Sequence, residues 1–171
     1  MAYNKKKIIW LLLLYLVIGG LLFSRFVLRP KVLIPKSSND STQNTVVKMR
    51  SGTLSINDKT VNIEVAENES QWYTGLSNRE SICSDCGMYF MFPYKDKLDF
   101  VMRDMKFPLD IIFIDGDKII NIAENLAPEG NNPTKIYSSV GAADGVLEVN
   151  GGFSNQYGIK AGDIIKDIKI N

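Results

Sequence analysis

The segment from Leu109 to Ile122 most constrains what this chain can fold into. Leu109–Ile114 is apolar at every position except Asp110, which indicates a strand buried on both faces of a sheet. Asp115-Gly116-Asp117 interrupts that pattern before Lys118–Ile122 resumes it. An Asp-Gly pair between apolar strands predicts a hairpin, because glycine tolerates positive φ. A calcium loop would need more oxygen ligands and a closing Glu, which this segment lacks.

Further strands are predicted on both sides of this hairpin. Alternating apolar positions indicate strands at Val61–Val65, Met88–Phe92 and Leu98–Met102, and a turn over Pro93–Asp96 should separate the last two. Asn68 with Gln71 three residues later resembles a helix N-terminal capping pair, and the short helix should end near Asn78. Val146–Val149 and Ile164–Ile170 complete about eight strands. The pattern predicts a mainly β fold, a compact antiparallel β-barrel or sandwich with one or two short helices.

The N-terminal part predicts a membrane anchor. Residues 8–28 are apolar except for Ser24 and Arg25, and as a helix they would span roughly 31 Å, about the thickness of a bilayer core. Lys5–Lys7 precede this segment, so residues 1–7 should be cytoplasmic. A cleaved signal peptide also fits, but the apolar run is long for one and no Ala-x-Ala-like site follows. We therefore predict a single-pass protein of the cell membrane whose C-terminal domain is extracytoplasmic.

Composition divides the remaining chain into a tether and a domain. Residues 29–45 are largely polar and are expected to form a flexible tether, which leaves residues 46–171 for one β domain. Seven of the 20 basic residues lie in the first 36 positions, so 13 basic residues face 19 acidic ones in the rest, a net charge of −6. Nucleic acid is therefore not an expected partner, because phosphate binding needs Lys and Arg. The membrane is the expected partner of the basic N-terminal part.

Cys83 and Cys86 are the two cysteines of the chain, and three interpretations stay open. In an extracytoplasmic domain a local disulfide is favoured. A thioredoxin-type redox site is the second interpretation, although that motif begins a helix and Gly87–Phe90 reads as a strand. A metal shared between two chains is the third, since zinc needs more soft or imidazole ligands and the chain has no histidine. No metal or cofactor is predicted within one chain.

The absence of histidine also restricts catalysis. Ser-His-Asp and Cys-His systems are impossible within this chain, and no catalytic constellation is recognisable. Carboxylate chemistry stays open through Asp104, Asp110 and Glu148. For Asp110 we favour a structural role, either capping backbone N–H groups or pairing with Arg103 or Arg79.

Several specific motifs follow one another along the predicted β domain. The first four are Trp72-x-x-Gly75-Leu76 with Arg79, Gly87-Met88-x-Phe90-x-Phe92, Phe100-x-Met102-Arg103-Asp104-Met105 and Pro108-Leu109-Asp110-x-x-Phe113-Ile114-Asp115. The later ones are Pro128, Tyr137-x-Ser139, Val146-Leu147-Glu148, Gly151-Gly152 and Gly162-Asp163. In this order the motifs resemble those of domain-of-unknown-function family 192. The resemblance implies a small, mainly β domain, often exported or membrane-anchored, and it implies no reaction.

Two departures from this family concern a candidate pocket. The family usually has Trp where Val101 stands and often Asn where Asp104 stands, so this chain should lack one aromatic wall and gain one charge. The Cys83/Cys86 pair is not a general feature of the family, which argues against a shared active centre there.

The favoured function is an envelope module that binds a small ligand, a glycan or an envelope protein in an aromatic and methionine-rich groove. The alternatives are a carboxylate-based hydrolase or lyase and, less favoured, a thiol redox protein using Cys83 and Cys86. The candidate groove residues are Arg79, Met88, Phe90, Phe100, Met102, Arg103, Asp104, Asp110, Tyr137 and Glu148.

Overall fold

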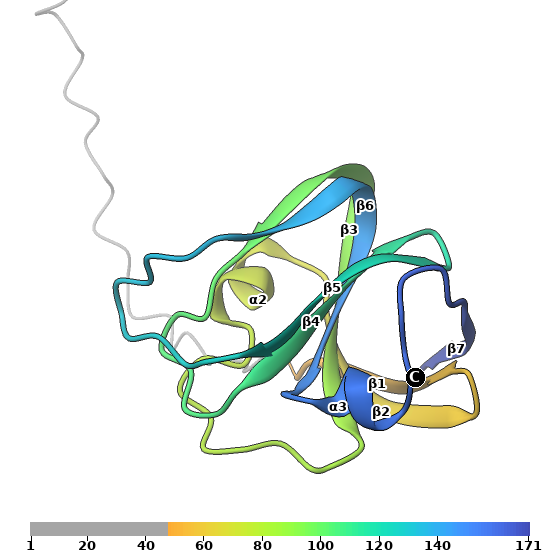
Figure 1. Cartoon of the computed structure of the whole chain (residues 1–171), viewed down its shortest axis with the longest axis horizontal. Coiled ribbons are helices and arrows are strands. Elements are labelled where there is room, and N and C mark those ends of the chain that lie inside the picture. The colour runs from red at the N-terminus through yellow and green to blue at the C-terminus, as the bar shows by residue number, and fades with distance from the viewer. Residues whose placement is uncertain (1–47) are drawn as a thin grey trace, which may run out of the picture. The chain divides into compact units, whose positions relative to one another are not determined.

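The computed structural model describes residues 48–171, which form a curled β-sheet with two short helices (Figure 1). The helices are α2 (Glu69–Thr74) and α3 (Phe153–Gln156). The strands are β1 (Arg50–Ile56), β2 (Lys59–Ala66), β3 (Cys86–Phe100), β4 (Leu109–Asp115), β5 (Lys118–Leu126), β6 (Tyr137–Asn150) and β7 (Ile165–Ile170).

The predicted cytoplasmic start, transmembrane helix and tether lie outside the described residues. Within residues 48–171, neither helix has the length and apolar character needed to cross a bilayer.

The seven strands form one sheet in the order β5-β4-β6-β3-β2-β1-β7. All neighbouring pairs are antiparallel except β2 and β3, which are parallel and are connected through α2. Within residues 48–171 the two edge strands form no ladder with each other, and they meet only at their starts, through an isolated bridge between Lys118 and Ile164 and a few backbone hydrogen bonds around it. The sheet is therefore not closed, and the predicted barrel or sandwich is wrong, whereas the mainly β fold with two short helices is confirmed.

β3 is one long strand where the sequence predicted two strands and a turn. It continues through Pro93–Asp96 and pairs with β6 on both sides of that segment, with a register shift between Met91 and Asp96. Such an irregularity accommodates proline, which lacks a backbone N–H for the ladder. Local sequence pointed to a turn, but pairing with the long β6 holds the chain extended, so there are seven strands and not eight.

The start of α2 is as predicted and its end is not. The Asn68 side chain accepts a hydrogen bond from the Gln71 backbone N–H at 3.1 Å, and the Gln71 side chain accepts one from the Glu67 N–H at 2.8 Å. The helix ends at Thr74 and not near Asn78, because Gly75 adopts a positive φ of 48°. Glycine takes this conformation without the strain that a Cβ would introduce, so it terminates the helix early.

The central strand and its hairpin are confirmed. β4 lies between β5 and β6, and only Asp115 at its end is not buried. Gly116 takes a φ of 65° in the turn that joins β4 to β5. The local signals were sufficient here because the turn needs only its own residues.

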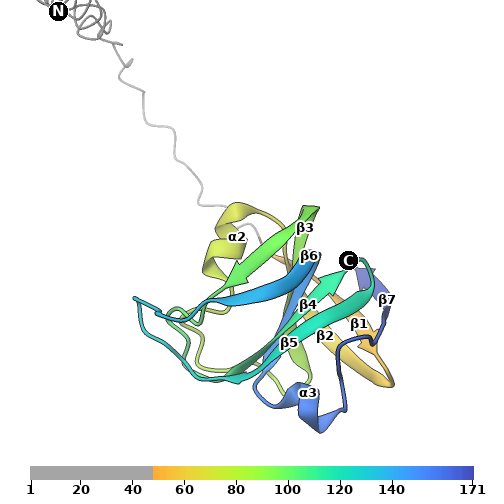
Figure 2. The ribbon, with the colours of Figure 1, turned by 45° about the horizontal axis from the view of Figure 1, so that its top comes forward.

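The two faces of the sheet bury two separate cores. The first includes Phe153 of α3, and we call it the α3-side core; its other members include Leu54, Val61, Ile112 and Leu147. The second lies on the side where Trp72 of α2 packs, and we call it the α2-side core; its members include Met88, Phe90, Ile111 and Val146. The two helices lie well apart in both views of the ribbon (Figures 1 and 2). Because side chains alternate along β4 and β6, neighbouring residues of one strand face different cores.

Candidate functional site

Glu148 is a buried carboxyl near the C-terminal end of β6. It lies beside Met88 of β3 and Ile111 of β4, which places it on the α2 side of the sheet. The residue is 5% exposed, and none of the hydrogen bonds or ion pairs found within residues 48–171 involves its carboxyl group. Burial raises the pKa of Glu148 from its ordinary 4.5 to about 8. The carboxyl therefore holds a proton at neutral pH, since desolvation disfavours its charged form.

A pocket of about 250 Å³ opens next to this carboxyl. Four segments form it: α2 with the residues that follow, β3, the chain immediately after β3, and β6, which contributes Glu148. Its polar side chains include those of Asp99, Arg103 and Glu148. Its aromatic side chains are Trp72, Tyr73, Phe90, Phe92 and Phe100.

The aromatic rings meet at steep angles. The ring centroids of Phe90 and Phe100 are 5.1 Å apart and those of Phe92 and Phe100 are 6.4 Å apart, each pair with an interplanar angle of 87°. Trp72 and Phe92 are closer to parallel, with centroids 4.8 Å apart and an angle of 34°. Edge-to-face pairs of this kind are favourable because a positive ring edge meets a negative ring face. The walls are therefore a rigid arrangement of rings with several orientations.

Gly75 brings the end of α2 against the pocket. A Cβ at this position would lie 3.3 Å from the Phe90 ring and 3.9 Å from the Glu148 Oε2 atom, and φ is positive. Glycine at this position therefore both ends α2 and lets the backbone lie close to the Phe90 ring and the Glu148 carboxyl.

Arg103 is held at the rim of the pocket. Its guanidinium carbon lies 3.9 Å from the centroid of the Tyr73 ring, and its Nη2 donates to the Tyr73 carbonyl oxygen at 2.6 Å. The Ser77 hydroxyl donates to the Arg103 carbonyl oxygen at 2.8 Å, which ties the chain after β3 to the chain after α2. Asp99, the other charged residue of the rim, accepts a hydrogen bond from the Ser138 hydroxyl at 2.5 Å.

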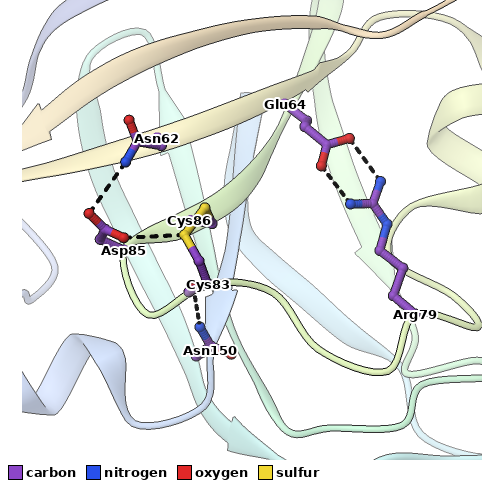
Figure 3. Close-up of a disulfide and its surroundings, with 7 residues drawn as sticks. All are labelled: Asn62, Glu64, Arg79, Cys83, Asp85, Cys86 and Asn150. Carbon is purple, nitrogen blue, oxygen red and sulfur yellow. Dashed lines mark hydrogen bonds and ion pairs between the residues drawn. A yellow bond between two sulfur atoms is a disulfide. The ribbon is translucent and has the colours of Figure 1, made fainter.

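Cys83 and Cys86 form a disulfide at the start of β3 (Figure 3), and neither residue lines this pocket. Their Cα atoms are 5.0 Å apart. The Asn150 side-chain amide donates to the Cys83 carbonyl oxygen at 2.8 Å, and an Asp85 carboxylate oxygen lies 3.2 Å from the Cys83 sulfur. These three ligand-type side chains, Cys83, Asp85 and Cys86, lie close enough together to hold a metal, but the bonded sulfurs cannot act as thiolate ligands. No helix starts at the pair, which agrees with the disulfide interpretation.

A known protein family matches most of the β domain. The family model for DUF192, described as an uncharacterized ACR, matches residues 52–166. The chain belongs to domain-of-unknown-function family 192. The predicted resemblance is therefore confirmed, and DUF192 carries no described reaction.

Two solved structures are similar to this DUF192 protein. One, from Sinorhizobium meliloti 1021, is named as a candidate transcription regulator; it is 28% identical, with a TM-score of 0.62, and the match covers 68% of this chain and 92% of that one. The other, from Novosphingobium aromaticivorans DSM 12444, is a protein of unknown function; it is 27% identical, with a TM-score of 0.63, over 77% of this chain and 94% of that one. No curated protein matches the chain.

Of the ten groove residues predicted from sequence, the structure brings four together at the pocket: Phe90, Phe100, Arg103 and Glu148. Met88 and Met102 are fully buried in the α2-side core, and Tyr137 packs against that core.

Arg79 and Asp104 lie elsewhere. Arg79 forms a two-point ion pair with Glu64, with N–O distances of 2.5 and 2.9 Å (Figure 3). Asp104 occupies a turn with a φ of 52°, where its backbone N–H donates to Gly130 and its carbonyl accepts from Asn78. Apart from glycine, Asn is among the residues that most readily adopt a positive φ, which explains why the family often has Asn at this position.

Asp110 is buried on the other side of the sheet and has a structural role. Its Oδ1 accepts hydrogen bonds from the N–H groups of Asn125 at 2.7 Å and Gly152 at 2.8 Å, and its Oδ2 accepts one from Ser154 at 2.7 Å. The predicted capping of backbone N–H groups is thus found, and pairing with Arg103 or Arg79 is not.

Sequence reasoning missed several residues that line the pocket, notably Trp72, Tyr73, Phe92 and Asp99. The Trp72-x-x-Gly75 motif was the available signal, because packing in the core of a helix does not explain why a glycine follows the tryptophan at this spacing. Val101 also lines the pocket, so the family's usual tryptophan would stand at this wall.

Proposed function

We propose that this DUF192 domain binds a small molecule in the aromatic pocket, with Glu148 as the polar anchor. The observation that carries the proposal is a buried carboxyl that has no partner among residues 48–171, at a pocket lined by aromatic side chains. A carboxyl that bonds to no group among residues 48–171 adds no hydrogen bond to the fold, and its position in the lining leaves its oxygens to a ligand. A pocket of about 250 Å³ is smaller than typical drug-binding clefts, which favours a small ligand.

Trp72 fluorescence provides the test. The chain has two tryptophans, so Trp10→Phe leaves Trp72 as the reporter in the pocket. A panel of small alcohols, amines, carboxylic acids and sugars is titrated into the full chain carrying this change. We expect at least one compound to shift the emission, and isothermal titration calorimetry should give the same affinity.

A filling variant checks that binding occurs in the pocket. Val101→Phe enlarges a lining side chain and should reduce the affinity at least tenfold, whereas Val140→Phe, at a position that is 76% exposed, should leave it unchanged. A panel without a single binder, or a binder that is insensitive to Val101→Phe, would contradict the proposal.

Acid catalysis is a second candidate because Glu148 holds a proton at neutral pH. A pKa of about 8 suits a general acid, and Asp99 supplies a second carboxyl at the pocket. Hydrolysis of nitrophenyl esters and glycosides by the full chain tests this candidate. A rate that falls above pH 8 and is lost in Glu148→Gln would support catalysis, and an absence of turnover would leave binding alone.

For the location, we propose a single-pass membrane protein with its DUF192 domain outside the cytoplasm. The apolar residues 8–28 support this, and the Cys83–Cys86 disulfide is of the kind that persists in oxidising compartments. Protease treatment of intact cells should digest the domain, whereas a cytoplasmic control protein should survive.

A further inference from the structure

We propose that the pocket around Glu148 binds a small organic cation, in particular an alkylammonium group, with Glu148 as its counter-ion. This inference rests on the proposed function and names the ligand class of that site. Its basis is the combination of aromatic walls, one carboxyl that has no partner within residues 48–171, and three lining donors that are already bonded to backbone oxygens.

The aromatic walls suit a cation that also carries methyl groups. A cation within about 6 Å of a ring centroid is attracted by the negative face of the ring, and aromatic cages for quaternary ammonium groups use this attraction. Phe90, Phe92 and Phe100 all line the pocket, and the first two each stand at a right angle to Phe100, so the lining rings differ in orientation. Methyl groups on the cation would at the same time bury apolar surface against these rings.

One ring of the pocket already binds a cation. The Arg103 guanidinium carbon lies 3.9 Å from the centroid of Tyr73, within the range of a cation–π contact. The same guanidinium donates to the Tyr73 carbonyl oxygen, so its position is fixed at the rim. A second cation deeper in the pocket would meet Glu148 and the remaining rings.

Most polar groups of the pocket favour a cation over a sugar, and the exception is the Arg103 guanidinium at the rim, which lies over the Tyr73 ring. Three donors in its lining are already bonded to backbone carbonyl oxygens: Trp72 Nε1 at 3.0 Å, Thr74 Oγ1 at 2.9 Å and Ser77 Oγ at 2.8 Å. A sugar would need such donors to be free. The carboxyl of Glu148, in contrast, has no partner within residues 48–171, and an ammonium group would supply one.

Binding of a cation should release a proton. The Glu148 carboxyl is protonated at neutral pH because burial raises its pKa to about 8, and a bound cation favours the ionised form. The proton leaves for the buffer, one per cation bound, and the carboxylate and ligand remain as an ion pair. The affinity for a cation should therefore rise with pH up to about 8, whereas a neutral ligand releases no proton.

The experiment compares choline with its uncharged isostere 3,3-dimethyl-1-butanol. Both are titrated calorimetrically into the full chain in phosphatidylglycerol nanodiscs, which contain no choline headgroup. We expect choline to bind at least tenfold more tightly than the isostere. At pH 7, repeating the choline titration in buffers of different ionisation enthalpy should show nearly one proton released.

Matched variants separate Glu148 from the general surface charge. Glu148→Gln should weaken choline at least tenfold and leave the isostere unchanged. Glu64→Gln, which removes a carboxyl outside the pocket, should change neither affinity. The isostere comparison needs no variant, so it decides the question even if Glu148→Gln fails to fold.

Equal binding of choline and the isostere would overturn the cation inference and leave a neutral ligand as the occupant of the proposed site. Choline binding without proton release, or binding unaffected by Glu148→Gln, would overturn it as well. If choline and the amines of the panel do not bind but an alcohol, a carboxylic acid or a sugar does, the site stands and the ligand class is wrong. If nothing binds, the proposed function fails together with this inference.

Discussion

Two buried carboxyls lie on opposite faces of the same sheet, and their surroundings differ completely. Asp110 is 0% exposed and accepts three backbone hydrogen bonds, whereas Glu148 is 5% exposed and has no partner within residues 48–171. They lie on adjacent, directly paired strands, β4 and β6. The comparison teaches that burial alone does not identify a functional acid. What distinguishes the two is whether the fold itself satisfies the carboxyl.

The largest expected effect is at Asp110. Asp110→Ala removes the acceptor of three buried or partly buried N–H groups, and hydrogen bonds to charged groups contribute about 1.5–3 kcal/mol each. We expect the free energy of unfolding, measured by urea denaturation, to fall by about 4 kcal/mol or more. Asp115→Asn, at a half-exposed position of the same strand, is the control and should have a small effect. A loss below about 1 kcal/mol for Asp110→Ala would mean that this carboxyl is not the anchor that its contacts suggest.

Glu148→Gln should raise the stability of the protein near neutral pH, whereas Asp110→Ala lowers it. Below pH 4.5 the carboxyl is protonated in both the folded and the unfolded chain. Between pH 4.5 and about 8 the unfolded carboxyl ionises while the folded one keeps its proton, so the stability of the native protein falls as pH rises. The slope is at most about 1.4 kcal/mol per pH unit, so the variant should gain on the order of 3 kcal/mol over the native protein near pH 7.

Urea denaturation at several pH values checks this prediction by measuring the difference in the free energy of unfolding between the native protein and Glu148→Gln. Two parallel stability curves would show that Glu148 ionises normally and would remove the contrast with Asp110.

The disulfide, like Asp110, should contribute to the stability of the fold. The Asn150 side chain joins the Cys83 carbonyl to the end of β6, two residues before Gly152, which donates to Asp110. Replacing both cysteines by serine opens a short loop and should lower the free energy of unfolding by about 2 kcal/mol. The pH dependence due to Glu148 should persist in this variant. Its disappearance would mean that the two faces are coupled.

The smallest effect is expected at a third carboxyl, that of Glu64. It lies opposite Met88, which in turn lies opposite Glu148, but it is half exposed and paired with Arg79. The hydrogen bond from Arg79 lowers the pKa of Glu64, so its contribution is lost as pH falls through that lowered pKa. Because exposed ion pairs contribute at most about 1 kcal/mol, Arg79→Met should change stability by less than that, and salt should reduce the difference. A larger, salt-independent change would place Glu64 with Asp110 as a structural acid.

The sequence predicted much of the local structure correctly. The β4–β5 hairpin needs only Asp115 and Gly116, and the start of α2 needs only Asn68 and Gln71. The Cys83–Cys86 pairing depends on a separation of three residues. The turn at Pro93–Asp96 was predicted wrongly because pairing with a distant strand, β6, overrides local turn preference.

The sequence by itself determined the family, the mainly β character and the residues that turn or cap the chain, because these depend on short-range alternation and backbone conformation. Only the tertiary structure decided which acid is satisfied. The donors to Asp110 come from residues 15, 42 and 44 positions away, and the pocket beside Glu148 is assembled from segments that meet only when α2 packs on the sheet. Hydrogen-bond satisfaction is a property of distant atoms brought within 3 Å, and no local pattern encodes it.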